Sequence, residues 1–369
     1  MNRLSDALDA MTVPASLVEP LEGGAVRCLA CAHRCRIPAG GRGVCQVRFN
    51  RAGELRVPWG YVAGLQSDPV EKKPFNHLLP GSDALTFGML GCDFHCDFCQ
   101  NWISSQALRD PAAGLDLAYI RRITPEQMVT AALRVGAKLI VSSYNEPLIT
   151  TEWALDIFKL AKESGLRCAY VSNGNATPEA LQALRPYLTA YKIDLKCMNT
   201  AHYRQLGGSL QHILDTIDLA YQLGLWVEVV TLVIPGFNDS VDELYDAALA
   251  IRAVSPNIPW HVTAFHPDYK KQDAPPTPAA TLQLAAEIGQ EAGLRYVYAG
   301  NLPGRVGSLE DTYCPQCHAL LVQRRGYTIL DYRVTAEGNC PQCGTAIAGV
   351  WTDDPGSVRL GGWGIPRRV

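Results

Sequence analysis

The sequence predicts an α/β protein whose central part is an open, partial parallel (β/α)6 barrel, with a small Cys-rich region at each end. The first observation is that short apolar runs alternate with helical patterns between about residues 84 and 300. Spacings of roughly 25–50 residues between these runs suit strand–helix–strand units and a parallel sheet. The second observation is that the cysteines form a central group and two outer groups. About six units are too few for a closed eightfold barrel, so we expect an open, TIM-like one.

The apolar runs and their flanking residues locate the elements. We expect strands at 84–90, 138–144, 167–173, 191–196, 226–234 and 260–265, with a further candidate at 294–300. Threonine caps, prolines at the first helical position and terminal glycines indicate helices. On these signals we expect helices at 124–136, 150–165 and 177–188.

The composition favours a soluble, folded protein. Of 369 residues, 47% are hydrophobic and 19% are charged, which suits a large buried core. A net charge of −3 gives no argument for binding nucleic acid or an anionic membrane. We see no signal-peptide pattern and no apolar stretch of about 18 residues, so we expect a cytoplasmic protein without membrane association. The length suits about two to three domains, which we place at 1–60, 61–305 and 306–369.

All but two of the thirteen cysteines lie in the three groups. In a reducing compartment, clustered cysteines are more often metal ligands or catalysts than disulfides. Cys168 and Cys197 stand apart and are expected in the core. The sequence therefore predicts three metal sites, at Cys28, Cys31, Cys35 and Cys45; at Cys92, Cys96 and Cys99; and at Cys314, Cys317, Cys340 and Cys343.

The central group has three thiolates, one fewer than a closed structural zinc or Fe–S site takes. Either a histidine completes a zinc site, and His95 lies inside the motif, or one metal position is left open. Segments containing Gly, Pro or polar residues follow each predicted strand, and the C-terminal ends of parallel strands share one rim. Because the cysteines follow the first strand, we expect their metal at that rim.

The pattern Cys92-x3-Cys96-x2-Cys99, with Phe98 before the last cysteine, resembles the signature of the radical S-adenosylmethionine (radical SAM) superfamily. The resemblance implies a 4Fe-4S cluster whose fourth iron binds the amino and carboxylate groups of S-adenosylmethionine. A fourth cysteine would block that approach. A zinc site would explain none of the motifs that follow along the chain.

Later motifs also resemble this superfamily, and their roles come with the resemblance. The implied cofactor-binding residues are Phe98, Asn145, Glu146, Ser172, Asn173, Asp194, Ile234 and Gly236. The Asp194-Leu195-Lys196 segment and a late-strand histidine resemble the activating enzymes of glycyl-radical proteins. They imply that the catalytic residues Asp194, Lys196 and His261 line the cavity where the radical meets its substrate.

Several of these residues also have a structural interpretation. Asp194 and Lys196 alternate along a strand, so they would suit an ordinary ion pair. His261, beside a tryptophan, would suit a satisfied core histidine. The segment 72–77, with two lysines and a histidine before the first strand, either closes over the site or is a solvated loop.

Segments 28–48, 68–82, 91–102 and 144–147 together resemble the AmmeMemoRadiSam-system radical SAM enzymes. That resemblance covers nearly the whole chain and implies Memo-type and AMMECR-type proteins as partners. The chain is also similar to the pyruvate formate-lyase activating enzyme branch of the superfamily.

The outer cysteine groups differ in regularity. Two C-x2-C motifs at 314–317 and 340–343, with a predicted strand between them, are typical of a tetrahedral site that holds zinc or rubredoxin-type iron. The spacing of Cys28, Cys31, Cys35 and Cys45 is less regular and suits zinc or an auxiliary Fe–S cluster, with His33 as an alternative ligand.

The leading hypothesis is a radical SAM enzyme that cleaves S-adenosylmethionine to a 5′-deoxyadenosyl radical, which abstracts hydrogen from an unidentified substrate. A flavodoxin or ferredoxin would supply the electron. One alternative is a glycyl-radical-enzyme activase acting on a protein backbone, and another is a metal-binding scaffold or electron-transfer protein without catalysis. RNA modification is disfavoured by the acidic balance of charge.

Overall fold

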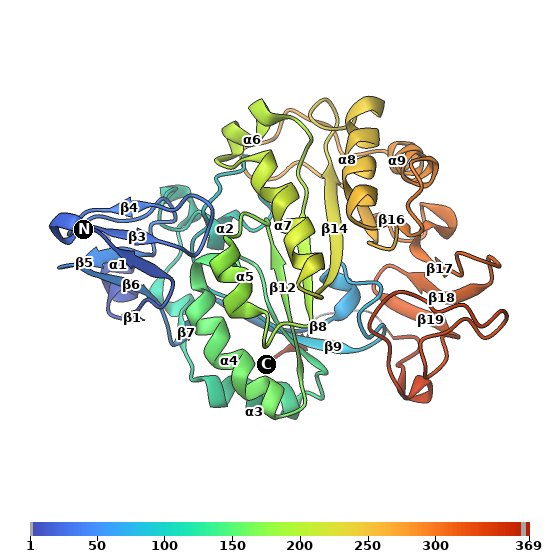
Figure 1. Ribbon diagram of the computed structural model, residues 1–369, viewed down its shortest axis with the longest axis horizontal. Coiled ribbons are helices and arrows are strands. Elements are labelled where there is room, and N and C mark those ends of the chain that lie inside the picture. The colour runs from blue at the N-terminus through green and yellow to red at the C-terminus, as the bar shows by residue number, and fades with distance from the viewer. Residues whose placement is uncertain (1–2, 363–366) are drawn as a thin grey trace.

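The computed structural model describes residues 3–362 and 367–369. Within them, a nine-stranded sheet has the order β16-β15-β14-β13-β12-β11-β9-β8-β20. The seven strands from β9 to β16 are parallel, whereas β8 and β20 add antiparallel at one edge. Figure 1 shows this sheet between the blue N-terminal region and the red C-terminal region.

All predicted strands are present, and the candidate at 294–300 joins the sheet as a seventh parallel strand. The open α/β fold is confirmed, with one parallel strand more than the six predicted. The parallel strands are β9 (Asp83–Gly88), β11 (Leu139–Ser142), β12 (Arg167–Ser172), β13 (Ala190–Asp194), β14 (Trp226–Val233), β15 (Trp260–Ala264) and β16 (Val297–Gly300). The antiparallel edge consists of β8 (Gly64–Pro69) and β20 (Arg367–Arg368), so the chain's end returns to the sheet.

Helices cover the outer face of the sheet (Figure 1): α3 (Pro125–Arg134), α4 (Thr151–Glu163), α5 (Pro178–Leu184), α7 (Leu210–Gln222), α8 (Val241–Val254) and α9 (Ala279–Glu291). The three helices expected from the sequence are α3, α4 and α5. Thr124 caps α3, since its hydroxyl accepts a hydrogen bond from the Gln127 amide at 3.3 Å. α5 ends before Pro186, earlier than predicted, because a proline ring does not fit inside a helix.

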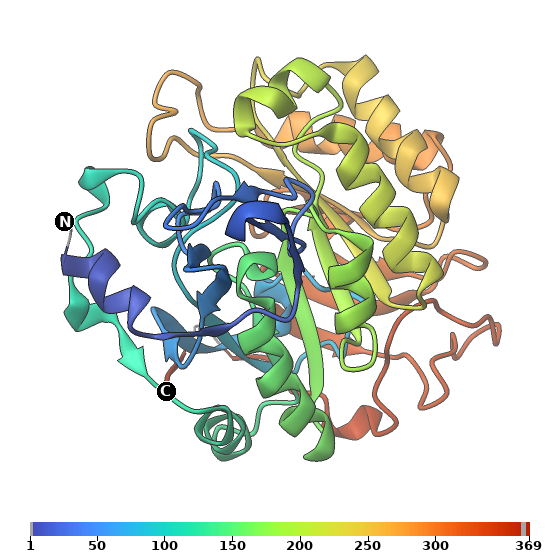
Figure 2. The same cartoon turned by 60° about the vertical axis from the view of Figure 1, so that its left-hand side comes forward.

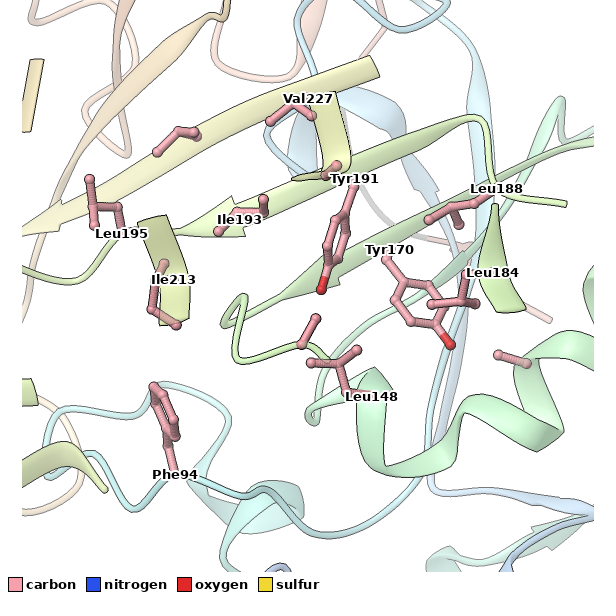
Figure 3. Close-up of a cluster of buried hydrophobic side chains, with 14 of the residues drawn as sticks. Phe94, Leu148, Tyr170, Leu184, Leu188, Tyr191, Ile193, Leu195, Ile213 and Val227 are labelled. Atoms are coloured by element: carbon pink, nitrogen blue, oxygen red, sulfur yellow. The ribbon is translucent and has the colours of Figure 1, made fainter. Parts of the chain in front are cut away.

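Large apolar side chains fill the space between the strands and these helices. Tyr170 and Tyr191, on neighbouring strands, point toward the turn that carries Leu148 (Figure 3). All three are fully buried. The Tyr191 hydroxyl donates to Ser172 Oγ at 3.0 Å, which satisfies its polar atom inside the core.

The N-terminal region shares its hydrophobic core with the barrel. It holds α1 (Arg3–Asp9) and two small sheets of three strands each. The first sheet has the order β1 (Thr12–Pro14), β6 (Glu54–Pro58), β5 (Phe49–Arg51). The second has the order β2 (Val18–Pro20), β3 (Val26–Cys28), β4 (Arg36–Ile37). The buried Arg48 guanidinium pairs with Glu152 of α4 and donates to the Ile149 carbonyl at 2.8 Å. In Figure 2 the blue N-terminal segments lie over the barrel. One contact between the two parts is a hydrogen bond from the Ala32 amide to the Asn175 carbonyl.

The C-terminal region forms a small sheet with its own hydrophobic cluster. Its strands are β17 (Thr312–Tyr313), β18 (Leu320–Arg325) and β19 (Thr328–Tyr332). Tyr296 and Tyr298, at the last barrel strand, belong to this cluster and connect the two parts. The domain boundaries at residues 60 and 305 stay predictions. The remaining elements are β7 (Tyr61–Val62), β10 (Arg121–Arg122), α2 (Trp102–Ser105) and α6 (Thr200–Leu206).

His77 joins the barrel to the C-terminal region. Its Nδ1 lies 2.6 Å from the Ala348 carbonyl oxygen, and its Nε2 lies 2.5 Å from the Tyr298 hydroxyl. Burial lowers the pKa of His77 to about 4, despite the nearby Glu228 carboxylate. The neutral ring therefore bridges the two regions at neutral pH.

This burial predicts acid sensitivity. Between pH 6.5 and pH 4 the unfolded chain takes up a proton that the folded His77 does not, so stability falls with falling pH. From pH 7.5 to pH 5, His77 should reduce the free energy of unfolding by about 2 kcal/mol. Urea denaturation at both pH values should show a smaller pH effect in His77→Gln than in the parent. His212→Gln, at an exposed position of α7, should behave like the parent; an unchanged pH effect in His77→Gln would contradict the prediction.

Within residues 3–362 and 367–369, no helix combines the length and apolar character needed to cross a membrane.

Candidate active site at the C-terminal edge of the sheet

The central cysteines lie in the loop that leaves β9 at the C-terminal edge of the parallel sheet. The Phe94 amide donates to Cys92 Sγ at 3.3 Å, and Cys99 Sγ lies 3.2 Å from Ser105 Oγ. These cysteines and Cys96 line a cavity of about 100 Å³. Three thiols around one space fit a 4Fe-4S cluster with an open position.

His95 does not contribute to this cavity. Its ring packs against Gly207, where an added Cβ would lie 2.7 Å from the ring. The residues that line the cavity include Cys92, Cys96 and Cys99 but not His95. This placement does not support a zinc site completed by His95.

Four of the residues implied as cofactor ligands, Asn145, Glu146, Ser172 and Asn173, line the same cavity. They come from the loop after β11, from the last residue of β12 and from the loop that follows it, as the shared rim of parallel strands predicted. The structure therefore brings the first three motifs together around one space; the roles of these residues stay predictions.

Glu146 holds two of these loops in place. Its Oε1 accepts hydrogen bonds from the Leu148 amide at 3.0 Å and from Ser172 Oγ at 2.7 Å. Its Oε2 accepts from the Asn173 amide at 2.7 Å. Burial and the neighbouring Asp93 carboxylate raise the pKa of Glu146 well above its usual range.

Asp93 is a buried residue that the sequence did not single out. Its carboxylate accepts hydrogen bonds from Asn173 Nδ2 at 2.7 Å and Asn175 Nδ2 at 2.9 Å, and His33 Nε2 lies 4.0 Å away. Asp93 thus connects the cysteine loop, the loop after β12 and the N-terminal cysteine region. Its position directly after Cys92 gave no signal, because an aspartate in a loop is ordinary.

Asp194 and its two lysines form the next part of the wall. Asp194 forms ion pairs with Lys192 and, at 3.1 Å, with Lys196. Although burial opposes ionisation, the two ammonium groups lower the pKa of Asp194 to about 2. Lys192 was not singled out from the sequence, although Lys192 and Asp194 are two residues apart in one strand and so share one face; Lys196 follows just past the end of β13.

A second cavity of about 350 Å³ adjoins the first. Cys99, Asp194 and Lys196 line both cavities, and Phe98 lines the larger one. A third cavity, of about 640 Å³, is lined by Asp83, Lys138 and Arg167, at the starts of β9, β11 and β12, and so lies at the opposite end of the sheet. Position relative to the cysteines, and not size, identifies the candidate site.

Three implied residues lie outside both of the adjoining cavities. His261, the second residue of β15, is in register with Val230; its Nε2 lies 2.6 Å from Glu228 and its ring stacks on Tyr298 at 5.2 Å. His261 is not among the residues that line either cavity, and its catalytic role stays a prediction. Ile234 is buried in the core, and Gly236 lies in an exposed turn with φ 76°, where an added Cβ would meet no atom within 4 Å.

The C-terminal cysteines are arranged for a single metal ion. The sulfur atoms of Cys314, Cys317, Cys340 and Cys343 lie within 4.8 Å of one another, with pairs at 3.6 and 3.7 Å. A tetrahedral ion with sulfur ligands at about 2.3 Å requires edges of about 3.8 Å. The predicted C-terminal metal site is therefore present.

The N-terminal cysteines lie around the β3–β4 connection. The Cys28 amide donates to the Cys35 carbonyl at 3.0 Å, and Arg48 Nη1 lies 3.4 Å from Cys28 Sγ. Cys31 and Cys45 are buried, and burial and nearby Cys28 raise the pKa of the Cys45 thiol to about 11. Cys168 is buried in β12, as expected. Cys197 is also buried, but its sulfur lies within 4.8 Å of ligand atoms of His202 and Glu243.

The chain matches the family model of the radical SAM superfamily over residues 87–248. Residues 87–248 therefore form a radical SAM domain, and the cysteine-lined cavity at the edge of the parallel sheet lies within it. Such a domain implies a 4Fe-4S cluster, S-adenosylmethionine and a source of electrons. Homologues in this superfamily are enzymes.

Over most of its length the chain is similar to uncharacterized protein MJ0808 of Methanocaldococcus jannaschii. The two are 38% identical over 336 residues, which cover 90% of this chain and 98% of that protein. This chain is also 26% identical over 166 residues to GTP 3',8-cyclase of Aquifex aeolicus, and the alignment covers 42% of this chain and 48% of the cyclase. A solved radical SAM methyltransferase from Sphaerobacter thermophilus aligns with TM-score 0.47 and 14% identity, over 83% of this chain and 85% of that one.

Proposed function

We propose that this chain is a radical SAM enzyme that acts on a small molecule. The observation that carries the proposal is the pair of adjoining cavities, of which the smaller is lined by the three cysteines. The larger, at about 350 Å³, lies within the range of about 300–1,000 Å³ that is usual for small-molecule sites. This size favours a metabolite over the protein backbone that an activase would have to admit.

Cys92, Cys96 and Cys99 would hold the 4Fe-4S cluster, and the loops joined by Glu146 would form the adjoining wall. When reduced, this cluster supplies the electron that cleaves S-adenosylmethionine to methionine and a 5′-deoxyadenosyl radical. Asp194 and Lys196 line both cavities, so they would orient reactants at the boundary between them. The chain contributes chiefly by fixing positions and excluding water.

The finer assignments are proposals as well. The four-segment resemblance supports membership of the AmmeMemoRadiSam-system enzymes, with Memo-type and AMMECR-type proteins as partners. A flavodoxin or ferredoxin would be the electron donor. The N-terminal cysteines would hold zinc or an auxiliary Fe–S cluster.

The proposal is tested by anaerobic reconstitution with iron and sulfide, followed by reduction and addition of S-adenosylmethionine. We expect the parent to form 5′-deoxyadenosine and the Cys92/Cys96/Cys99→Ala variant to form none. Cys168→Ala, a change at a buried cysteine outside both cavities, should retain the activity. Electron paramagnetic resonance of the reduced parent should change when S-adenosylmethionine is added.

A fully reconstituted parent that forms no more product than the triple variant, with no spectral change, would contradict the proposal. It would favour the metal-binding scaffold instead. A spectral change without product would indicate that the cofactor binds and that cleavage requires the substrate.

We further expect the C-terminal site to hold one zinc ion. Mass spectrometry of the purified parent should find zinc bound at this site, and Cys340→Ala should lose it. Because structural zinc contributes folding energy directly, Cys340→Ala should also melt at a lower temperature. Iron in place of zinc, with the visible absorption of a four-thiolate iron site, would contradict the zinc assignment.

A further inference from the structure

The larger cavity is lined by four lysines, which pair with only two carboxylates. On one wall, Asp68 of β8 is shared by two lysines. Its carboxylate oxygens lie 3.0 Å from Lys72 Nζ and 2.5 Å from Lys73 Nζ, and the Tyr144 hydroxyl also donates to it at 2.5 Å. One carboxylate therefore forms ion pairs with two ammonium groups and accepts a hydrogen bond from a phenol.

A second part of the lining has the same arrangement, since Asp194 is shared by Lys192 and Lys196. All four lysines line the same cavity. Four ammonium groups against two carboxylates leave a net charge of two positive units around a space of about 350 Å³. A cleft with such a charge and low-dielectric walls concentrates anions.

Burial makes this excess costly in the absence of a ligand. Lys73 has only 4% of its side chain exposed, and burial lowers the pKa of Lys73 to about 8 even with Asp68 beside it. Buried charge is stable only when paired and hydrogen-bonded. Because Asp68 is already shared, an incoming oxyanion would complete the pairing of Lys72 and Lys73.

The neighbouring backbone is also held in an unusual conformation. Tyr144 has φ 66°, a left-handed conformation that is rare for an aromatic residue. Its hydroxyl bonds to Asp68, and Lys73 Nζ lies 4.3 Å from the centre of its ring. Residues held this way cluster at functional sites. Tyr327, from the turn between β18 and β19, lines the same cavity, so the C-terminal region contributes to its wall.

The two pairs of lysines differ in which of the two cavities they line. Lys196, with Asp194, also lines the cysteine cavity, whereas Lys72 and Lys73 line only the larger one. We propose that Lys72 and Lys73 bind a carboxylate or phosphate group of the substrate, which is therefore a small anionic molecule. This inference rests on the proposed function, since it identifies the substrate class of the same site.

The proposed anion binding is tested by measuring ligand affinity in the absence of turnover. The reconstituted protein, with S-adenosylmethionine present, would be titrated calorimetrically with succinate and, separately, with inorganic pyrophosphate; succinamide is the uncharged control. We expect one of the two anions to bind at one site per chain and succinamide not to bind. The anion that binds identifies the source of the oxyanion. Because hydrogen bonds to charged groups contribute about 1.5–3 kcal/mol, Lys72→Met and Lys73→Met should each weaken binding about 10- to 100-fold.

Lys159→Met removes the same charge from an exposed position of α4 and should bind like the parent. Cluster absorption and the melting temperature of each lysine variant report whether it is folded. The inference is overturned if neither anion binds more tightly than about 1 mM, or if folded Lys72→Met and Lys73→Met bind as the parent does. It is then distinguishable from failure of the proposed function, which would appear as absent 5′-deoxyadenosine and an unchanged cluster spectrum.

Discussion

Replacing Asp194 with alanine should reduce S-adenosylmethionine cleavage by about 100-fold or more while the cluster remains bound. Asp194 is the carboxylate between Lys192 and Lys196, and it lines both the cysteine cavity and the larger one. Without it, two ammonium groups lose their partner and move. Because a displacement of about 1 Å can reduce a rate about 100-fold, loss of this fixed arrangement should be severe.

The measurement is the anaerobic rate of 5′-deoxyadenosine formation, with iron content and cluster absorption determined on the same sample. Asp218→Ala is the matched control, because Asp218 is exposed on α7 and its carboxylate bonds only locally, to Gln222 at 2.7 Å. A folded, cluster-containing Asp194→Ala variant with the parent's rate would show that the ion pairs are purely structural.

Replacing Glu228 with alanine should lower the free energy of unfolding by about 3–5 kcal/mol, because each buried donor left without its acceptor costs about 1–3 kcal/mol. Glu228 is fully buried and accepts hydrogen bonds from the amides of Asn76 and His77 and from the Trp226 indole, each at 2.9 Å. Its fourth partner is His261 Nε2, at 2.6 Å. Alanine would leave all of these groups buried without an acceptor.

This effect should also reach the C-terminal region, because His77 bonds to Ala348 and Arg324 bonds to the Asn76 carbonyl at 2.8 Å. Urea denaturation of the metal-loaded protein measures the change. Glu287→Ala, at an exposed position of α9, serves as the control. Glu228→Gln should lie between Glu228→Ala and the parent, since the amide keeps one acceptor oxygen. Equal denaturation midpoints for Glu228→Ala and the parent would refute this account of the network.

The outcome for His261 shows what sequence patterns can and cannot locate. Period-2 alternation predicts which face of a strand a side chain occupies, and His261 does lie inside the barrel fold, buried. His261 is in register with Val230, which lines the larger cavity, but its Nε2 lies against the Glu228 carboxylate at 2.6 Å. Alternation does not show which buried partner a side chain on that face will take.

The sequence by itself determined the parallel strands, the rim at which the cysteines lie and the pairing of the two C-terminal C-x2-C motifs. These depend on local periodicity, on caps and turns, and on short spacings between ligands. Only the tertiary structure decided that Lys72 and Lys73 line the same cavity as Lys192 and Lys196, and that Asp93 connects three separate segments. Asp68 and Tyr144 are 76 residues apart in the chain. Such contacts arise when β8 adds antiparallel to β9 and the strands come together, which no local pattern encodes.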